Sequence, residues 1–92
     1  MIISSQKMSA IIELLRKFGA RRIFLFGSYL DKPEKANDLD LAVEGIPLNR
    51  LLDADVELSG ILSMPFDLIS SEENPDFFRI VREYGKVLYE EK

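Results

Sequence analysis

Residues 23–43 read IFLFGSYLDKPEKANDLDLAV, and this stretch decides the fold. Its first four residues are an apolar run without alternation, which is typical of a β-strand buried on both faces. Gly27 and Ser28 end that run, and the polar residues that follow predict a turn or a short helix. Residues 38–43 alternate, so they predict a second strand with one apolar face and one face that carries two aspartates.

Further helices and strands are predicted on both sides of this stretch. The pattern predicts a first helix between Ser5 and Gly19, a helix over 48–62, a strand over 66–69, a helix from Asn74 to Gly85 and an edge strand over 87–89. The predicted fold class is α/β (mixed α+β), with a small mixed sheet of three to four strands and helices packed on it. Residues 1–92 are expected to form a single domain.

Apolar side chains of the last predicted helix indicate which of its faces is buried. Helical spacing assigns to that face Phe77, Ile80, Val81 and Tyr84. Three further apolar side chains are candidates for exposed contacts with a partner: Tyr29, Leu30 and Phe78. For Phe78, simple burial is the interpretation that we favour.

The composition excludes several classes of function. The chain has 92 residues with 12 Lys and Arg against 16 Asp and Glu, a formal net charge of −4, so we expect no direct contact with nucleic acid. Since it has no His and no Cys, we exclude His-based triads, thiolate zinc sites and disulfides. No apolar run approaches the roughly 20 residues of a membrane span, and no signal-peptide pattern is seen. We therefore expect a cytoplasmic protein without membrane contact.

Three aspartates carry the strongest chemical signal. Asp38 and Asp40 are two residues apart on one strand, so they point to the same face, and exposure to water explains an isolated pair well. Asp67 has apolar neighbours in the third predicted strand, where an ionised carboxylate is costly unless it is paired or coordinated. If the second and third strands are neighbours, the three carboxylates converge and favour a hard cation such as Mg²⁺ or Mn²⁺. A hydrogen bond to local backbone explains Asp67 equally well.

Gly27 and Ser28 gain meaning from these aspartates. A glycine after a buried strand allows close approach of a ligand, and a serine hydroxyl can hold phosphate oxygens, although an ordinary turn explains a lone Gly-Ser more simply. Together, Gly27-Ser28, Asp38-Leu39-Asp40 and the downstream Asp67 resemble the nucleotidyltransferase superfamily that includes DNA polymerase beta. The chain is most similar to the minimal nucleotidyltransferases, or MNT proteins, and this resemblance covers nearly all of it.

The resemblance implies a metal-dependent nucleotidyltransferase that moves a nucleoside monophosphate, AMP from ATP, onto an acceptor hydroxyl. It implies that Asp38 and Asp40 bridge two Mg²⁺ ions, with Mn²⁺ as an alternative. Asp67 would complete the site of the ion nearer the attacking hydroxyl and help to activate that hydroxyl. Gly27 and Ser28 would hold the β- and γ-phosphates of the nucleoside triphosphate. Two ions at one site fit the need to neutralise attacking and leaving oxygens.

The resemblance also implies a partner. MNT proteins are similar to antitoxins that pair with HEPN toxins, and AMP transfer to a toxin tyrosine is the implied antitoxin activity. Since 92 residues leave no room for an acceptor domain, we expect the acceptor to be a protein or to bind at a subunit interface of a homo-oligomer.

One departure from the family pattern supports an alternative function. Related proteins often carry an arginine shortly after the Gly-Ser pair, whereas this chain continues with Tyr29-Leu30-Asp31. Asp31 would repel a triphosphate, and Lys32 and Lys35 offer point charges without the planar fork of arginine. The alternative is a catalytically weak or inactive interaction module that neutralises its partner by binding alone.

Overall fold

The structure, a computed structural model, describes residues 2–91. Its elements are α1 (Ser5–Lys17), β1 (Arg22–Phe26), α2 (Ser28–Asp31), a 3₁₀ turn η1 (Pro33–Lys35), β2 (Leu39–Glu44), α3 (Leu48–Ile61), β3 (Phe66–Ser70), α4 (Pro75–Tyr84) and β4 (Lys86–Glu90). The predicted order and the mixed α/β class are confirmed. β2 begins one residue later than predicted, so Asp38 lies in the loop directly before the strand. No helix in residues 2–91 is both long and apolar enough to cross a membrane.

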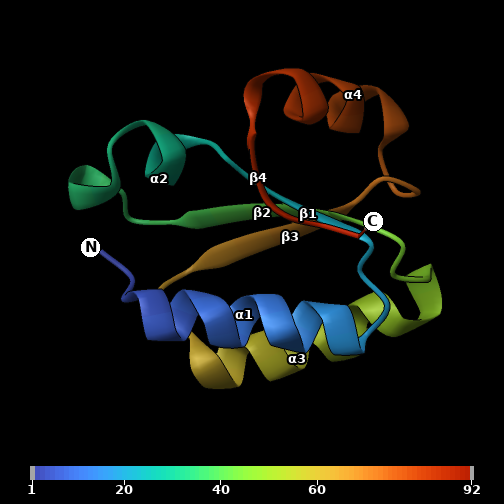
Figure 1. Cartoon of the computed structure of the whole chain (residues 1–92), viewed down its shortest axis with the longest axis horizontal. Helices are drawn as coiled ribbons and strands as arrows, with labels where there is room; N and C mark the ends of the chain where they lie inside the picture. Colours follow the sequence, from blue (N-terminus) through green and yellow to red (C-terminus); the bar gives the residue numbers. More distant parts are fainter. Residues whose placement is uncertain (1, 92) are drawn as a thin grey trace.

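The strands form one mixed sheet in the order β3-β2-β1-β4. β1 is antiparallel to both β2 and β4, whereas β2 and β3 are parallel. A parallel pair needs a crossover connection, and α3 provides it between β2 and β3. Figure 1 shows α1 and α3 on one face of the sheet and α2 and α4 on the other.

The face toward α1 and α3 carries the larger hydrophobic core. Alternate strand residues enter it because successive side chains of a strand point to opposite faces. The fully buried strand residues of this core are Ile23, Leu39, Leu41 and Val43. The fully buried helix residues that belong to the same core are Ile11, Leu15, Ala54 and Leu58. This face is closed to solvent, which leaves the opposite face for a site.

A smaller core lies beneath α4. It consists of Phe24, Ala42, Phe78 and Val81. The rings of Phe24 and Phe78 meet edge to face, with centroids 5.5 Å apart and planes at 87°, an arrangement that aromatic pairs favour. The predicted burial of Phe78 and Val81 is therefore confirmed. Because Phe24 enters this core while its neighbours in β1 enter the other, the apolar run of β1 is buried on both faces, as predicted.

For the other three residues of the predicted buried face of α4, the prediction of burial is wrong. Phe77, Ile80 and Tyr84 are 37%, 54% and 74% exposed. Apolar residues occupy more than one stripe of this helix, so helical spacing alone does not fix which stripe meets the sheet. The stripe that fits the small core is Phe78 with Val81, and this turns Phe77, Ile80 and Tyr84 to the side. We refer to these three residues as the α4 flank.

Tyr29 is also placed differently from the prediction. Its side chain is buried at 7% exposure rather than presented to a partner, and Leu30 is half-buried. The backbone N–H of Ile3 donates to the Tyr29 hydroxyl at 2.8 Å, so the segment before α1 covers this ring. The contact joins residues far apart in sequence, which is why local pattern could not reveal it.

Candidate functional site

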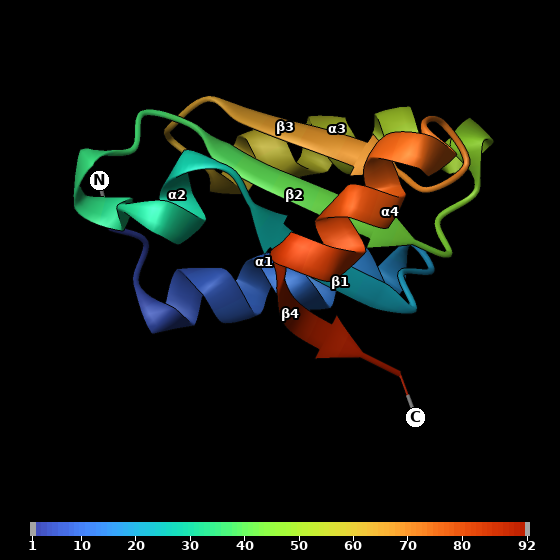
Figure 2. The ribbon, with the colours of Figure 1, turned by 90° about the horizontal axis from the view of Figure 1, so that it is seen from above.

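Acidic side chains meet where β2 and β3 begin. The two strands are parallel, and their register pairs Asp40 directly with Asp67 and Leu41 with Leu68. Leu41 and Leu68 both belong to the core beneath α1 and α3, so Asp40 and Asp67 project from the opposite face. The predicted adjacency of the second and third strands, with Asp67 on the face of Asp40, is confirmed. Figure 2 views this face, with α2 and α4 over different parts of it.

Asp38, Asp40 and Asp67 make up what we call the acidic group, and Asp40 lies at its centre. It is half-buried, and burial raises the pKa of its carboxyl; the negative charges of Asp67 and Asp38 raise that pKa further. A hydrogen bond with the Asp67 side chain acts in the same direction, because it favours a proton on the Asp40 carboxyl. Asp38 is exposed in the loop before β2 but lies near enough for its charge to act on Asp40. The structure thus brings all three predicted aspartates into one electrostatic group.

Gly27 packs against the carboxylate of Asp40. Phe26 is the cross-strand partner of Asp40, which places Gly27 beside it at the end of β1. A Cβ at position 27 would overlap Asp40 Oδ2 and would lie 3.0 Å from Asp40 Cγ. The φ of Gly27 is +77°, a conformation that residues with a side chain rarely adopt. Gly27 therefore leaves the space that the Asp40 carboxylate occupies, a contact that the sequence prediction did not include.

Ser28 follows at the start of the four-residue helix α2 and is exposed. Its backbone carbonyl accepts from the N–H of Lys32 at 2.8 Å, which closes this short turn. Asp31 and Lys32 are exposed near the end of the same turn, so a negative and a positive charge lie close to Ser28 in the chain. The structure places Ser28 one residue from Gly27, at the rim of the acidic group; its contact with phosphate stays a prediction.

The carboxylates of Asp38, Asp40 and Asp67 are suitable ligands for a hard cation, but their positions in this structure do not yet form a complete site. Its donors are all carboxylate oxygens, which Mg²⁺ and Mn²⁺ prefer. Asp40 and Asp67 are register partners on one face, and a divalent cation would relieve the repulsion between their carboxylates. However, within residues 2–91 no three acidic side chains are gathered closely enough to hold a metal ion.

The aromatic pair Phe26 and Phe77 lies beside the acidic group, and the sequence does not predict it. The rings of Phe26 and Phe77 have centroids 5.5 Å apart and planes at 73°. Phe26 is the cross-strand partner of Asp40, and cross-strand partners share a face, but the sequence leaves this register open. Phe77 was assigned to the buried face of its helix, and only the packing of α4 shows that it lies at the site.

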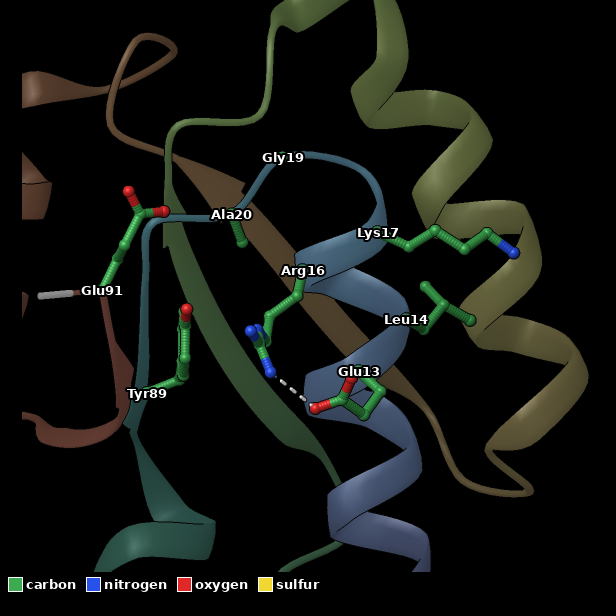
Figure 3. A pocket seen from close by; sticks show the side chains of 8 residues that line it. All are labelled: Glu13, Leu14, Arg16, Lys17, Gly19, Ala20, Tyr89 and Glu91. Carbon is green, nitrogen blue, oxygen red and sulfur yellow. Dashed lines mark hydrogen bonds and ion pairs between the residues drawn. The ribbon is translucent and has the colours of Figure 1, made fainter.

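A separate hollow of about 610 Å³ lies between α1 and β4, away from the aspartates (Figure 3). The Arg16 guanidinium stacks 4.5 Å from the centroid of the Tyr89 ring and binds Glu13 at 2.8 Å. None of the candidate residues lines this hollow. Its size alone does not make it the functional site, because its arginine is already neutralised by Glu13 and its surroundings supply no grouped carboxylates.

Comparisons with known proteins identify the family of the chain and proteins of similar fold. Residues 9–92 match the family model described as polymerase beta, nucleotidyltransferase. No curated protein matches the sequence. One similar solved structure is a toxin-antitoxin with AMP-PNP: it is 26% identical, with a TM-score of 0.75, and the match covers 92% of this chain and 74% of that one.

Two further solved structures share the fold at 24% identity. One is the toxin-antitoxin MntA-HpeT with two Asp-to-Glu substitutions, with a TM-score of 0.75 and coverage of 92% of this chain and 74% of that one. The other is an MNT antitoxin in complex with tri-AMPylated Shewanella oneidensis HEPN toxin, with a TM-score of 0.73 and coverage of 96% and 73%.

Proposed function

The chain belongs to the polymerase beta nucleotidyltransferase family, and from this premise we propose that it transfers AMP from ATP to a hydroxyl of a HEPN-type partner protein and so acts as its antitoxin. The observation that carries the proposal is the meeting of Gly27, Asp40 and Asp67 at the ends of three adjacent strands. A phosphate-approaching glycine next to paired carboxylates is the arrangement that nucleotidyl transfer needs.

Similar structures support the choice of nucleotide and partner. One of them contains AMP-PNP, an ATP analogue, and another contains a HEPN toxin that carries three AMP groups. The present chain spans about three quarters of each of those chains. Its fold and its candidate site lie within the shared part.

The proposed reaction is an in-line attack of the partner's hydroxyl oxygen on the α-phosphorus of ATP. The new O–P bond forms as the bond from the α-phosphorus to the bridging oxygen breaks, and pyrophosphate leaves. Asp67 takes the hydroxyl proton, while Gly27 and Ser28 hold the β- and γ-phosphates. Asp38, Asp40 and Asp67 would hold Mg²⁺, which supplies positive charge to the attacking and leaving oxygens.

Label transfer tests the proposal. The protein is incubated with α-labelled ATP, Mg²⁺ and a HEPN-type partner protein. We expect label on the partner, and a loss of at least about 100-fold with Asp38→Asn or Asp40→Asn, because each removes a carboxylate that would hold Mg²⁺ at the reacting phosphate. Asp53→Asn, an exposed aspartate on α3, is the matched control and should transfer normally. Undiminished labelling by both site variants would contradict the proposal.

A second candidate function is neutralisation of the partner by binding alone. Two observations favour it: Asp31 follows the Gly-Ser pair where an arginine is typical, and the aspartates of residues 2–91 do not form a gathered group of three ligands. This function predicts complex formation without nucleotide or metal. It also predicts that Asp40→Asn protects against the partner as well as the parent protein does, whereas the transferase function predicts loss of protection.

A further inference from the structure

The aromatic pair at the edge of the acidic group has no role in the proposed reaction. Phe26 ends β1, and its cross-strand partner is Asp40, so the two side chains lie on one face of the sheet. Phe77 reaches it from α4 and makes an edge-to-face contact with centroids 5.5 Å apart. Phe77 is nevertheless 37% exposed, which leaves part of its ring open beside the site.

We propose that this pair is the nucleobase platform of the site, where the base of the bound nucleoside triphosphate stacks on the open face of Phe77. The inference rests on the proposed function and names the subsite for the nucleoside half of the substrate. In the proposed function the phosphates bind at Gly27 and Mg²⁺ at Asp40, and both residues adjoin Phe26. The ribose is a short link between the α-phosphate and the base, so the base lies close to these residues.

The surroundings favour stacking over hydrogen bonding to the base. The α4 flank continues from Phe77 with Ile80 and Tyr84, both more than half exposed, so an apolar wall extends along the helix. On the sheet side, the carboxylates of Asp40 and Asp67 offer no flat apolar surface on which a base could stack. Stacking on an aromatic ring accepts any base, because every base has a π-face. Because a purine offers a larger π-face than a pyrimidine, we expect this platform to bind ATP and GTP about equally and pyrimidine nucleotides less tightly.

Binding of two ligands separates the platform from the phosphate site. The dissociation constants of Mg²⁺-ATP and Mg²⁺-tripolyphosphate are measured by calorimetry on the full chain. Phe77→Ala should weaken ATP binding about 5- to 150-fold, the range measured for removal of a stacking ring. Tripolyphosphate has no base, so its affinity should change less than about twofold. Leu52→Ala, an exposed apolar residue of α3 on the other face, is the control and should change neither.

Two further variants keep the test decisive if Phe77→Ala does not fold. Phe77→Tyr retains the ring and should bind ATP as the parent does, whereas Phe77→Leu retains apolar volume alone and should bind ATP less tightly. Equal ATP affinity in the leucine and tyrosine variants would overturn the inference. So would unchanged ATP binding by a folded Phe77→Ala, and a simultaneous loss of partner binding would then assign the α4 flank to a protein contact.

The failure of the inference can be distinguished from failure of the proposed function. If the parent chain binds neither ATP nor tripolyphosphate, the proposed function fails and the platform fails with it. The other case is that the parent binds both ligands and Phe77→Ala leaves the ratio of the two dissociation constants unchanged. The transferase proposal then stands, and only the platform is overturned.

Discussion

The two faces of the sheet differ in what their side chains do. The face toward α1 and α3 is closed by apolar residues such as Leu41, whose exposure is zero. The face toward α4 carries the smaller core around Phe24 and Ala42, and Asp40 and Asp67 lie on the same face, where β2 and β3 begin. Figure 2 views this face, with α4 over part of it. One strand serves both, since Asp40 and Leu41 are neighbours in β2 that point in opposite directions. Alternate residues of β2 thus serve different purposes: one set packs in the core, and the other lies on the face of the candidate site.

The largest expected effect follows from emptying the closed face. Leu41→Ala should reduce the free energy of unfolding by about 2–5 kcal/mol, because it removes buried methyl groups and leaves a cavity between β2 and the two helices. Urea denaturation measures this change. Leu52→Ala makes the same chemical change at a side chain that is 73% exposed, and it should change stability by less than about 0.5 kcal/mol. Similar losses in both variants would show that burial does not divide the faces as we describe.

A smaller effect is expected at the boundary between the faces. Gly27→Ala should cost about 1–3 kcal/mol, because alanine is strained at a φ of +77° and its Cβ meets the Asp40 carboxylate. The displaced carboxylate should also weaken Mg²⁺-ATP binding, measured by calorimetry. Gly60→Ala is the matched control: nothing lies within 4 Å of a Cβ there, and alanine favours the helix α3, so this variant should gain about 0.5–1 kcal/mol. A Gly27→Ala protein as stable as its parent would contradict the described contact.

The sequence predicts the closed face better than the open one. Alternation in β2 and the apolar run of β1 assign strand residues to faces, because a strand has only two choices for each side chain. A helix has a continuous range of orientations, so α4 could be placed only with its packing partners known. Phe78 and Val81 fit over Phe24, and this turns Phe77 out to the side. The predicted buried stripe fails for that reason.

The candidate site shows the same limit. Asp40 and Asp67 could be matched because strand pairing aligns residues in register, and the typical Gly-Ser and Asp-x-Asp spacing pointed to the family. The contact of Gly27 with Asp40 depends on a hairpin register that the sequence leaves open. Local pattern leaves Tyr29 a candidate for either exposure or burial, because its partner, the backbone of Ile3, is 26 residues away. Contacts of this kind follow from the assembled fold and not from local pattern.

The smallest expected effect tests the charge balance of the open face. Burial, then the charges of Asp67 and Asp38, raise the pKa of Asp40 in the folded protein. A raised pKa means that the folded state prefers the protonated carboxyl, so the parent protein loses stability as the pH rises through the unfolded and then the folded pKa of this group. Asp40→Asn cannot ionise, and its amide can still donate to Asp67. It should match the parent at pH 3 and be more stable at pH 7.

That gain at pH 7 should be less than about 1 kcal/mol, because water screens a half-exposed carboxylate. Urea denaturation of both proteins at each pH gives the difference in stability. Carboxylates far from position 40 titrate alike in the two proteins, so this difference reports Asp40 together with its coupled neighbours Asp38 and Asp67. Asp53→Asn on the exposed face of α3 controls for the loss of one negative charge and should show no such growth with pH. If Asp40→Asn were instead less stable than the parent at pH 7, the ionised Asp40 carboxylate would stabilise the folded protein. The open face would then contribute to stability as the closed face does, and the contrast between them would fail.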